Sequence, residues 1–291
     1  NQRRRRFPKM YSDTTKAITD SLSKAHGNGG SQSSDWILHH IMDGNYLDFS
    51  PFGKIMLPEF YIGDIHVVIT RHIVFMWLAA ILLTFLLIRV AKRYKKTQIP
   101  NRLTSAVEIL ILFVRDEIAK PSIGGGYEKF VPYLLTAFFF ILFANFLGLI
   151  PFSATVTSNI SITATLATAT FVVTQWGGMR KNGFFGYFKG LIPHGIPVFL
   201  LPIMIVVELL GLFTKPFALA IRLFANMTAG HIVIYALIGL IFAMNTLAVA
   251  PVSVGMALFI YLLEILVAML QAYIFTMLSA VFIGMAVHQD H

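Results

Sequence analysis

The sequence contains no cysteine among its 291 residues, so neither a disulfide nor a thiolate metal site can form. Charged residues are also scarce, at 13%, whereas about a quarter of a soluble domain is charged. Apolar residues fill the chain instead: 56% are hydrophobic and the mean hydropathy is +0.72. Because a backbone in lipid must satisfy its own hydrogen bonds, this composition predicts an all-α polytopic membrane protein.

The net charge is +9, and much of it lies in two basic clusters, residues 1–9 and residues 89–102. Such clusters can bind nucleic acid, but next to apolar spans they are more typical of solvated or headgroup-facing flanks. We therefore expect membrane lipid, and no nucleic acid, as their partner. Residues 1–66 are predicted as a polar tail and loop, and residues 67–291 as the membrane domain. Within the tail we expect short helices at residues 12–25 and, amphipathic, at 35–48, and a loop at 49–66, where Pro51, Gly53, Pro58 and Gly63 lie.

About three stretches have the length of upright membrane spans: residues 71–91, 130–152 and 158–178. Residues 101–119 alternate apolar and charged side chains at helical spacing, which predicts one amphipathic surface helix. The basic segments 92–102 and 179–190 lie on the cytoplasmic or matrix side by the positive-inside rule, and the uncharged connection 151–158 lies outside. The N-terminus is then expected outside and the C-terminus in the cytoplasm or matrix.

Two longer apolar stretches follow, at residues 196–244 and about 252–287. As one helix the first would be about 70 Å long, whereas an upright span needs about 30 Å. It must either break at Pro216 into two spans or form one strongly tilted helix. Composition and periodicity leave both alternatives open.

The candidate site consists of polar side chains within these two stretches. At 100° per residue, Glu208, Arg222 and Asn226 fall on one stripe of a helix, and His231 falls nearly opposite. An ionisable group at membrane depth is costly and is retained where it is paired, wet or functional. One interpretation is a buried ion pair that holds helices in register. The other is a proton relay, in which Arg222, which does not deprotonate, is a fixed charge.

The last stretch carries Glu264 and Gln271, seven residues apart and therefore close to one face. Three runs resemble subunit a of F-type ATP synthases: KPFALAIRLFANMTAGH around Arg222, EILVAMLQAYIF from Glu264, and FFFILFANFLGLIP, which includes Asn145. The resemblance covers the chain from about residue 67 to the end. It implies that Arg222 is the essential arginine of the family, which faces a rotor ring of c subunits. It also implies that the last two helices are long, strongly tilted and packed against that ring.

The resemblance further implies two aqueous half-channels, offset around Arg222. His231 and Glu264 would line the outer half-channel, in the order that mitochondrial and several bacterial members share, while other bacterial members carry Glu and then His. Glu208 would lie toward the cytoplasmic or matrix half-channel. The polar neighbours of the path would be Asn226, Gln271 and Asn145.

These features predict a non-catalytic, proton-translocating subunit of the Fo part of an ATP synthase. Its expected partners are the c-ring, a peripheral stalk of subunit b type and the other synthase subunits, with no cofactor and no metal. A bacterial plasma membrane is favoured over the mitochondrial inner membrane.

The alternative is a self-contained ion-coupled transporter that uses Arg222 for an anionic substrate, but we find no inverted repeats of the kind common in transporters. A structural scaffold leaves Glu208, His231 and Glu264 unexplained.

Overall fold

The computed structural model describes residues 46–48, 54–56, 59–62, 65–68, 70–96, 101–150, 153, 155–190, 199, 201–244 and 246–288. These residues belong to two compact units. The larger unit comprises Asp43–Gly230 together with Tyr261–His291, and the smaller unit includes His231–Ile260. The helix predicted at 12–25 lies outside the described residues, as does the helix predicted at 35–48 except for its last three residues.

Four short strands precede the first long helix: β1 (Tyr46–Asp48), β2 (Lys54–Met56), β3 (Glu59–Ile62) and β4 (Ile65–Val68). They form two separate antiparallel pairs, β1 with β2 and β3 with β4. The prediction of a loop at 49–66, and of a helix reaching Asp48, was therefore wrong. The prolines and glycines lie between strands, and the strands themselves are rich in the aromatic and β-branched residues that favour extended backbone.

The first predicted span forms α3 (Arg71–Lys96). The predicted amphipathic segment is confirmed as helical, and it is continuous through three parts: α4 (Arg102–Leu112), the π-helical η2 (Phe113–Ala119) and α5 (Lys120–Ile123). It ends at Gly124, whose φ of 73° lies in a region that residues with side chains rarely adopt. A 3₁₀ turn, η3 (Tyr127–Lys129), leads into the next span.

The second and third predicted spans are also helices, with slightly different ends. The elements here are α6 (Val131–Gly148), η4 (Val156–Ser158), α7 (Ile160–Asn182) and α8 (Phe184–Gly190). The Asn159 side chain caps α7 by accepting a hydrogen bond from the backbone N–H of Ser161 at 2.9 Å. Threonines make α7 less apolar than the other long helices.

The two C-terminal stretches form α9 (Leu201–Met244, 44 residues) and α10 (Ala250–Val287, 38 residues), separated by η5 (Leu247–Val249). Helix α9 contains Pro216 without a break, so the alternative of two spans divided at this proline was wrong. Prolines are tolerated in membrane helices because neighbouring groups satisfy the freed backbone. Each helix is about twice the roughly 20 residues of an upright span.

Within the described residues, four helices are long and apolar enough to cross a membrane: α3, α6, α9 and α10. Together with the all-helical core, this confirms an all-α polytopic membrane protein. The short strands precede its first long helix.

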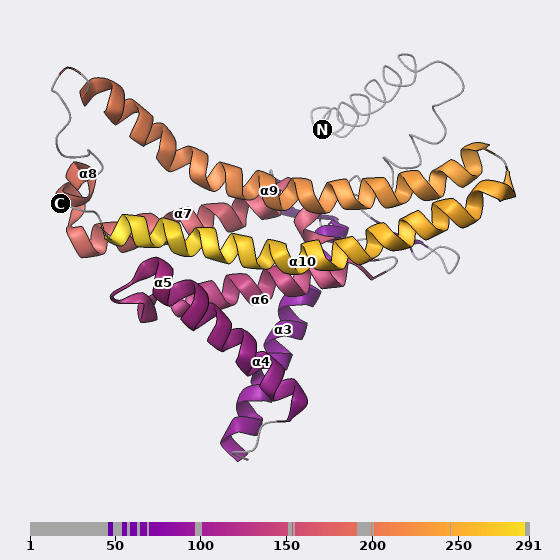
Figure 1. Ribbon diagram of the computed structural model, residues 1–291, viewed down its shortest axis with the longest axis horizontal. Helices are drawn as coiled ribbons and strands as arrows, with labels where there is room; N and C mark the ends of the chain where they lie inside the picture. The colour runs from indigo at the N-terminus through magenta and orange to yellow at the C-terminus, as the bar shows by residue number, and fades with distance from the viewer. Residues whose placement is uncertain are drawn as a thin grey trace. The chain divides into compact units, whose positions relative to one another are not determined.

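Helices α6, α7 and α10 run alongside one another (Figure 1). The core of the larger unit is formed by side chains of η2, α6 and α10. Its most buried side chains are at most 1% exposed and include Val114, Ile118, Leu134, Ile141, Phe275 and Ile283. Small residues allow close helix contact, as is common in membrane proteins. A Cβ on Gly284 of α10 would lie only 3.1 Å from the Ser122 carbonyl carbon, and one on Gly178 of α7 only 2.8 Å from the Ala286 carbonyl oxygen.

Candidate functional site: two polar regions beside Arg222

Arg222 lies midway along α9 and is exposed, as is its neighbour Ile221. On the other side of the helix, Leu219, Ala220 and Leu223 are at most 4% exposed and belong to the core. Arg222 makes no hydrogen bond or ion pair with any residue that the structure describes. The interpretation of Arg222 as half of a buried ion pair is therefore not supported in this part of the chain.

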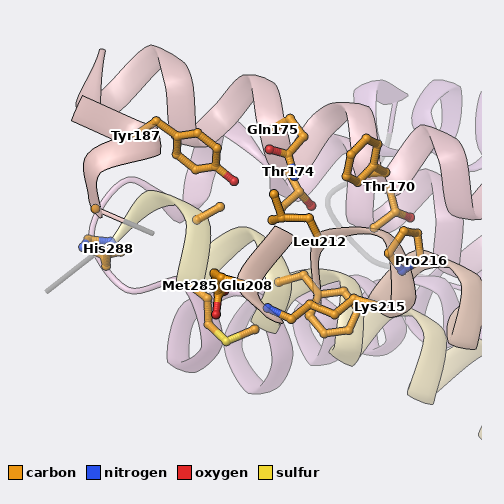
Figure 2. A pocket seen from close by; sticks show the side chains of 14 residues that line it. Thr170, Thr174, Gln175, Tyr187, Glu208, Leu212, Lys215, Pro216, Met285 and His288 are labelled. Atoms are coloured by element: carbon orange, nitrogen blue, oxygen red, sulfur yellow. The ribbon is translucent and has the colours of Figure 1, made fainter. Parts of the chain in front are cut away.

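The first polar region is a cavity of about 270 Å³ in the larger unit, on the N-terminal side of Arg222. Helices α7, α8, α9 and α10 all contribute to its wall (Figure 2). Two of its charged residues, Glu208 and Lys215, come from α9 and are half-buried. The stripe predicted from helical angles thus brings Glu208 to a cavity. Lys215, two turns further along α9, lines the same cavity, although no role was predicted for it.

The opposite wall of this cavity is made of hydroxyl and amide side chains: Thr170, Thr174 and Gln175 of α7 and Tyr187 of α8. Burial and the Glu208 carboxylate raise the pKa of the Tyr187 phenol, although its hydrogen bond with Gln175 opposes the shift. Tyr187 therefore stays protonated and can donate. The Thr174 hydroxyl is buried and has no hydrogen-bond partner among the described residues. Since an unmade buried hydrogen bond costs about 1–3 kcal/mol, this wall favours water in the cavity.

The second polar region surrounds Asn145, which is fully buried near the C-terminal end of α6. Its amide oxygen accepts a hydrogen bond from the Thr157 hydroxyl at 2.6 Å, and its amide nitrogen donates to the Ala268 carbonyl of α10 at 3.4 Å. Ala268 is one helical turn beyond Glu264. Asn145 therefore lies next to the helix that carries Glu264 and Gln271.

Asn226 and Gln271 join α9 to α10 within this region. The Asn226 amide donates to the Gln271 amide oxygen at 2.8 Å. Gln271 is only 1% exposed, and its amide nitrogen has no partner among the described residues. The predicted polar stripe of α9 therefore meets the predicted polar face of α10, and an unsatisfied donor remains there.

Glu264 is 4% exposed and packs directly on Gly230 of α9. A Cβ on Gly230 would lie 2.8 Å from the Cγ and Cδ atoms of Glu264, too close for a side chain of any size. Gly230 therefore provides the space that the Glu264 carboxylate occupies. His231, the next residue, begins the described part of the smaller unit, where it is half-buried with its ring centroid 6.4 Å from that of Tyr235.

The two polar regions lie on opposite sides of Arg222 along α9. At 1.5 Å per residue, Glu208 is about 21 Å before Arg222, and Asn226 about 6 Å after it. Between the two regions the inner face of α9 consists of buried apolar side chains, with Leu219 and Leu223 at most 1% exposed. The larger unit thus contains two polar regions and an apolar barrier, with a single arginine on the exposed side of that barrier.

Several members of these regions were not predicted from the sequence. The α7 threonines at 163, 170 and 174 share one buried face, and their spacing is the signal that could have been used. Thr157 lies in the connection after α6, and only its contact with Asn145 shows its place.

Comparisons with known proteins agree with this geometry. The family model described as "ATP synthase A chain" matches residues 73–284. The chain is 55% identical over 258 residues to "ATP synthase subunit a" of Chloroherpeton thalassium, covering 87% of this chain and 77% of that protein. It is 51% identical over 273 residues to "ATP synthase subunit a 2" of Prosthecochloris aestuarii, covering 92% and 84%. The family model matches most of the chain, and these relatives are more than half identical to it. The chain therefore belongs to the family of F-type ATP synthase subunit a.

Proposed function

We propose that this chain is the non-catalytic, proton-translocating subunit of the Fo part of an ATP synthase, and that Arg222 separates two half-channels. The observation that carries the proposal is the placement of an exposed arginine between two polar regions on one long helix. Its partners are the c-ring, a peripheral stalk of subunit b type and the other synthase subunits. The membrane is an energy-coupling one, for which the motifs favour a bacterial plasma membrane.

The exposure of Arg222 supports a partner that carries an acid. The two helices also expose apolar side chains, since Phe217 and Ile221 on α9 and Leu266 and Leu270 on α10 are between 40% and 66% exposed. A charge facing lipid at this depth costs about 2.5–3.5 kcal/mol on insertion scales. A rotor carboxylate that passes Arg222 would remove this cost, and the same carboxyl would need to be protonated before it could face lipid.

The unsatisfied polar groups support water on both sides of the barrier. The Thr174 hydroxyl faces the cavity at Glu208, and the buried Gln271 amide nitrogen belongs to the region of Asn145 and Glu264. Water in either region would satisfy these groups and carry protons. Between Pro216 and Asn226 no such group is found among the described residues of α9, where Leu219 and Leu223 are buried.

Charge at the helix ends supports an orientation. The cavity lies beside the basic C-terminal end of α7, where the Lys181 ammonium nitrogen is 3.0 Å from Nδ1 of His288. By the positive-inside rule this end belongs to the cytoplasm or matrix. The Asn145 region lies at the opposite end of α6 and α7, next to a connection without charge, and so belongs outside.

The mechanism follows from this arrangement. A proton enters from outside by way of His231 and Glu264 and neutralises a rotor carboxylate that has left Arg222. The neutral carboxyl crosses the lipid as the ring turns and releases its proton into the cavity at Glu208. Each charge moved across 100 mV contributes about 2.3 kcal/mol. Because Arg222 keeps its proton, the two regions exchange protons only through the ring.

Reconstitution with and without partners tests this assignment against a self-contained transporter. The purified chain alone in vesicles should show no ion-coupled uptake, whereas the chain assembled with its c-ring, its stalk and the other synthase subunits should acidify vesicles when ATP is added. The fluorescence of an entrapped pH dye measures both. Substrate-dependent, ion-coupled uptake by the chain alone would show that the transporter alternative is correct.

A further inference from the structure

Lys215 is a charged residue within a membrane-spanning stretch of α9, and nothing above gives it a role. It is half-buried and lines the same cavity as Glu208. Its ammonium group makes no hydrogen bond or ion pair with Glu208 or with any other residue that the structure describes. A lysine that only neutralised Glu208 would be expected to pair with it, because an unpaired charge at membrane depth is costly. The charge of Lys215 is therefore available to another group.

Helical geometry places Lys215 at the edge of the exposed face of α9. Lys215 and Arg222 are seven positions apart, which is about 20° around the helix and about 10.5 Å along it. Arg222 is exposed. On the other side of Lys215, about 40° further round, Leu219 is only 1% exposed. Lys215 thus lies where the cavity meets the face that carries Arg222.

The cavity extends along α9 from the region of His288 to Lys215. Figure 2 shows Tyr187 and His288 at one end of the cavity and Lys215 and Thr170 at the other. The His288 end is the one that the proposed orientation places toward the cytoplasm or matrix. Lys215 is therefore at the deep end, and it is the last charged residue of α9 before Arg222.

The titratable groups that face Lys215 across the cavity come from three helices. Helix α9 contributes Glu208, α8 contributes the protonated phenol of Tyr187, and His288 follows the end of α10. The side chains that α7 contributes carry hydroxyl and amide groups without charge: Thr170, Thr174 and Gln175. Among the residues that line this cavity, Lys215 is the one lysine or arginine, so it provides the fixed positive charge there.

Distance limits what Arg222 can do for a carboxylate at the deep end of the cavity. The attraction between two charges falls as their separation grows, and salt screens it over about 10 Å. A carboxylate beside Lys215 is about 10.5 Å from Arg222 along α9, so Arg222 stabilises it only weakly. Lys215 can stabilise it directly, because an opposite charge within about 4–6 Å favours the ionised form of a carboxyl group.

We propose that Lys215 is a second fixed positive charge on the path of the rotor and favours release of the proton from the rotor carboxyl into the cavity. The inference rests on the proposed function of the chain. In this step the O–H bond of the neutral carboxyl breaks, and its proton passes to water in the cavity. The carboxylate that forms is held by Lys215 until Arg222 takes it over. The ammonium group keeps its own protons, so one proton leaves for each carboxyl that becomes ionised.

Sided pH profiles of the assembled synthase in vesicles test this role. The membrane potential is fixed with potassium and valinomycin, and the rate of ATP synthesis is measured while the pH of one side is varied. Lys215→Met removes the charge but keeps a long unbranched side chain. Ionisation of the rotor carboxyl then needs a lower proton concentration in the cavity. The rise of synthesis with cavity-side pH should therefore move about one pH unit higher than in the wild type.

ATP-driven pumping checks the same step in reverse. The rotor carboxylate then takes its proton from the cavity, so pumping by the wild type declines when the cavity side becomes alkaline. In Lys215→Met the neutral carboxyl forms more readily, and this decline should also move to higher pH. Varying the pH of the outer side should give profiles of the same shape in wild type and variant.

Two control variants separate charge from packing. Lys215→Arg keeps the positive charge and should keep the wild-type profiles. Lys129→Met removes an exposed lysine of η3 that does not line the cavity, and it should also leave the profiles unchanged. If Lys215 only filled space, its replacement with methionine would lower the rates equally at every pH without moving the profiles.

Chemical restoration of the charge gives a test that does not depend on assembly of Lys215→Met. The chain has no cysteine, so Lys215→Cys introduces its one thiol. After assembly, aminoethyl methanethiosulfonate adds an ammonium group through a disulfide and releases methanesulfinate, whereas methyl methanethiosulfonate adds a neutral group in the same way. The first reagent should return the cavity-side profiles toward the wild type, and the second should not. Wild-type complex treated in parallel reports modification of the other subunits.

Cavity-side profiles of Lys215→Met that match the wild type, or equal shifts on both sides, would overturn the proposal, as would equal effects of the two reagents on Lys215→Cys. Arg222→Ala, measured in parallel, distinguishes this outcome from failure of the proposed function. Full synthesis by Arg222→Ala would reject the function itself. Loss of synthesis in Arg222→Ala together with wild-type profiles in Lys215→Met would reject only the role of Lys215.

Discussion

Replacing Arg222 with alanine is expected to abolish ATP synthesis by the assembled complex and to allow protons to leak through it. Without the fixed charge, an ionised rotor carboxylate loses its partner at the barrier. A loss of about 2.5–3.5 kcal/mol would slow its passage roughly 100-fold or more. The same change removes the positive charge that keeps protons in the Asn145 region from reaching the cavity at Glu208.

Synthesis and leak can be measured in the same vesicles, as ATP formed under an imposed proton gradient and as decay of that gradient without nucleotide. Arg102→Ala is the matched control, because Arg102 is also exposed but lies at the start of α4, away from both polar regions. It should retain synthesis and a tight membrane. Substantial synthesis in Arg222→Ala would contradict the proposed role of this residue.

Replacing Glu264 with glutamine is expected to reduce ATP-driven proton pumping and ATP synthesis about 100-fold or more, within the range for loss of a proton-transfer group. Glutamine has nearly the same size, so it should fit against Gly230 as glutamate does. It cannot bind and release a proton, however. The loss would therefore report titration, and the amount of assembled complex should be unchanged.

Initial rates of vesicle acidification, normalised to the amount of this chain, provide the measurement. Glu128→Gln is a suitable control, since Glu128 is an exposed carboxylate in the 3₁₀ turn η3. Its variant should pump at the wild-type rate. If Glu264→Gln also pumped at the wild-type rate, Glu264 would have only a structural role, and the outer path would have to use other groups.

Periodicity predicted the helices of the membrane domain well, because apolar runs of span length have few other solutions in lipid. It also placed Asn226 and Gln271 on faces that turn out to be in contact. It could not decide the outcome at Pro216, because whether a proline breaks a helix depends on the groups that pack around it. The strands at 46–68 were missed because prolines and glycines there were interpreted as one loop.

Long-range contacts account for the rest of the site. Helical angles give the face on which Glu208 lies, but not the α7 threonines and Tyr187 that enclose it. The burial of Glu264 depends on the absence of a side chain at Gly230, 34 positions earlier in the sequence.

The most direct test of two half-channels divided at Arg222 is the sidedness of access to single cysteines. The chain has no cysteine of its own, so each introduced thiol is unambiguous. Thr174→Cys probes the cavity at Glu208, and Ser158→Cys probes the outer region. A small membrane-impermeant thiol reagent should inhibit Ser158→Cys only from the outside and Thr174→Cys only from the cytoplasmic or matrix side. Inhibition of both variants from the same side would contradict the division of the chain into two proton paths.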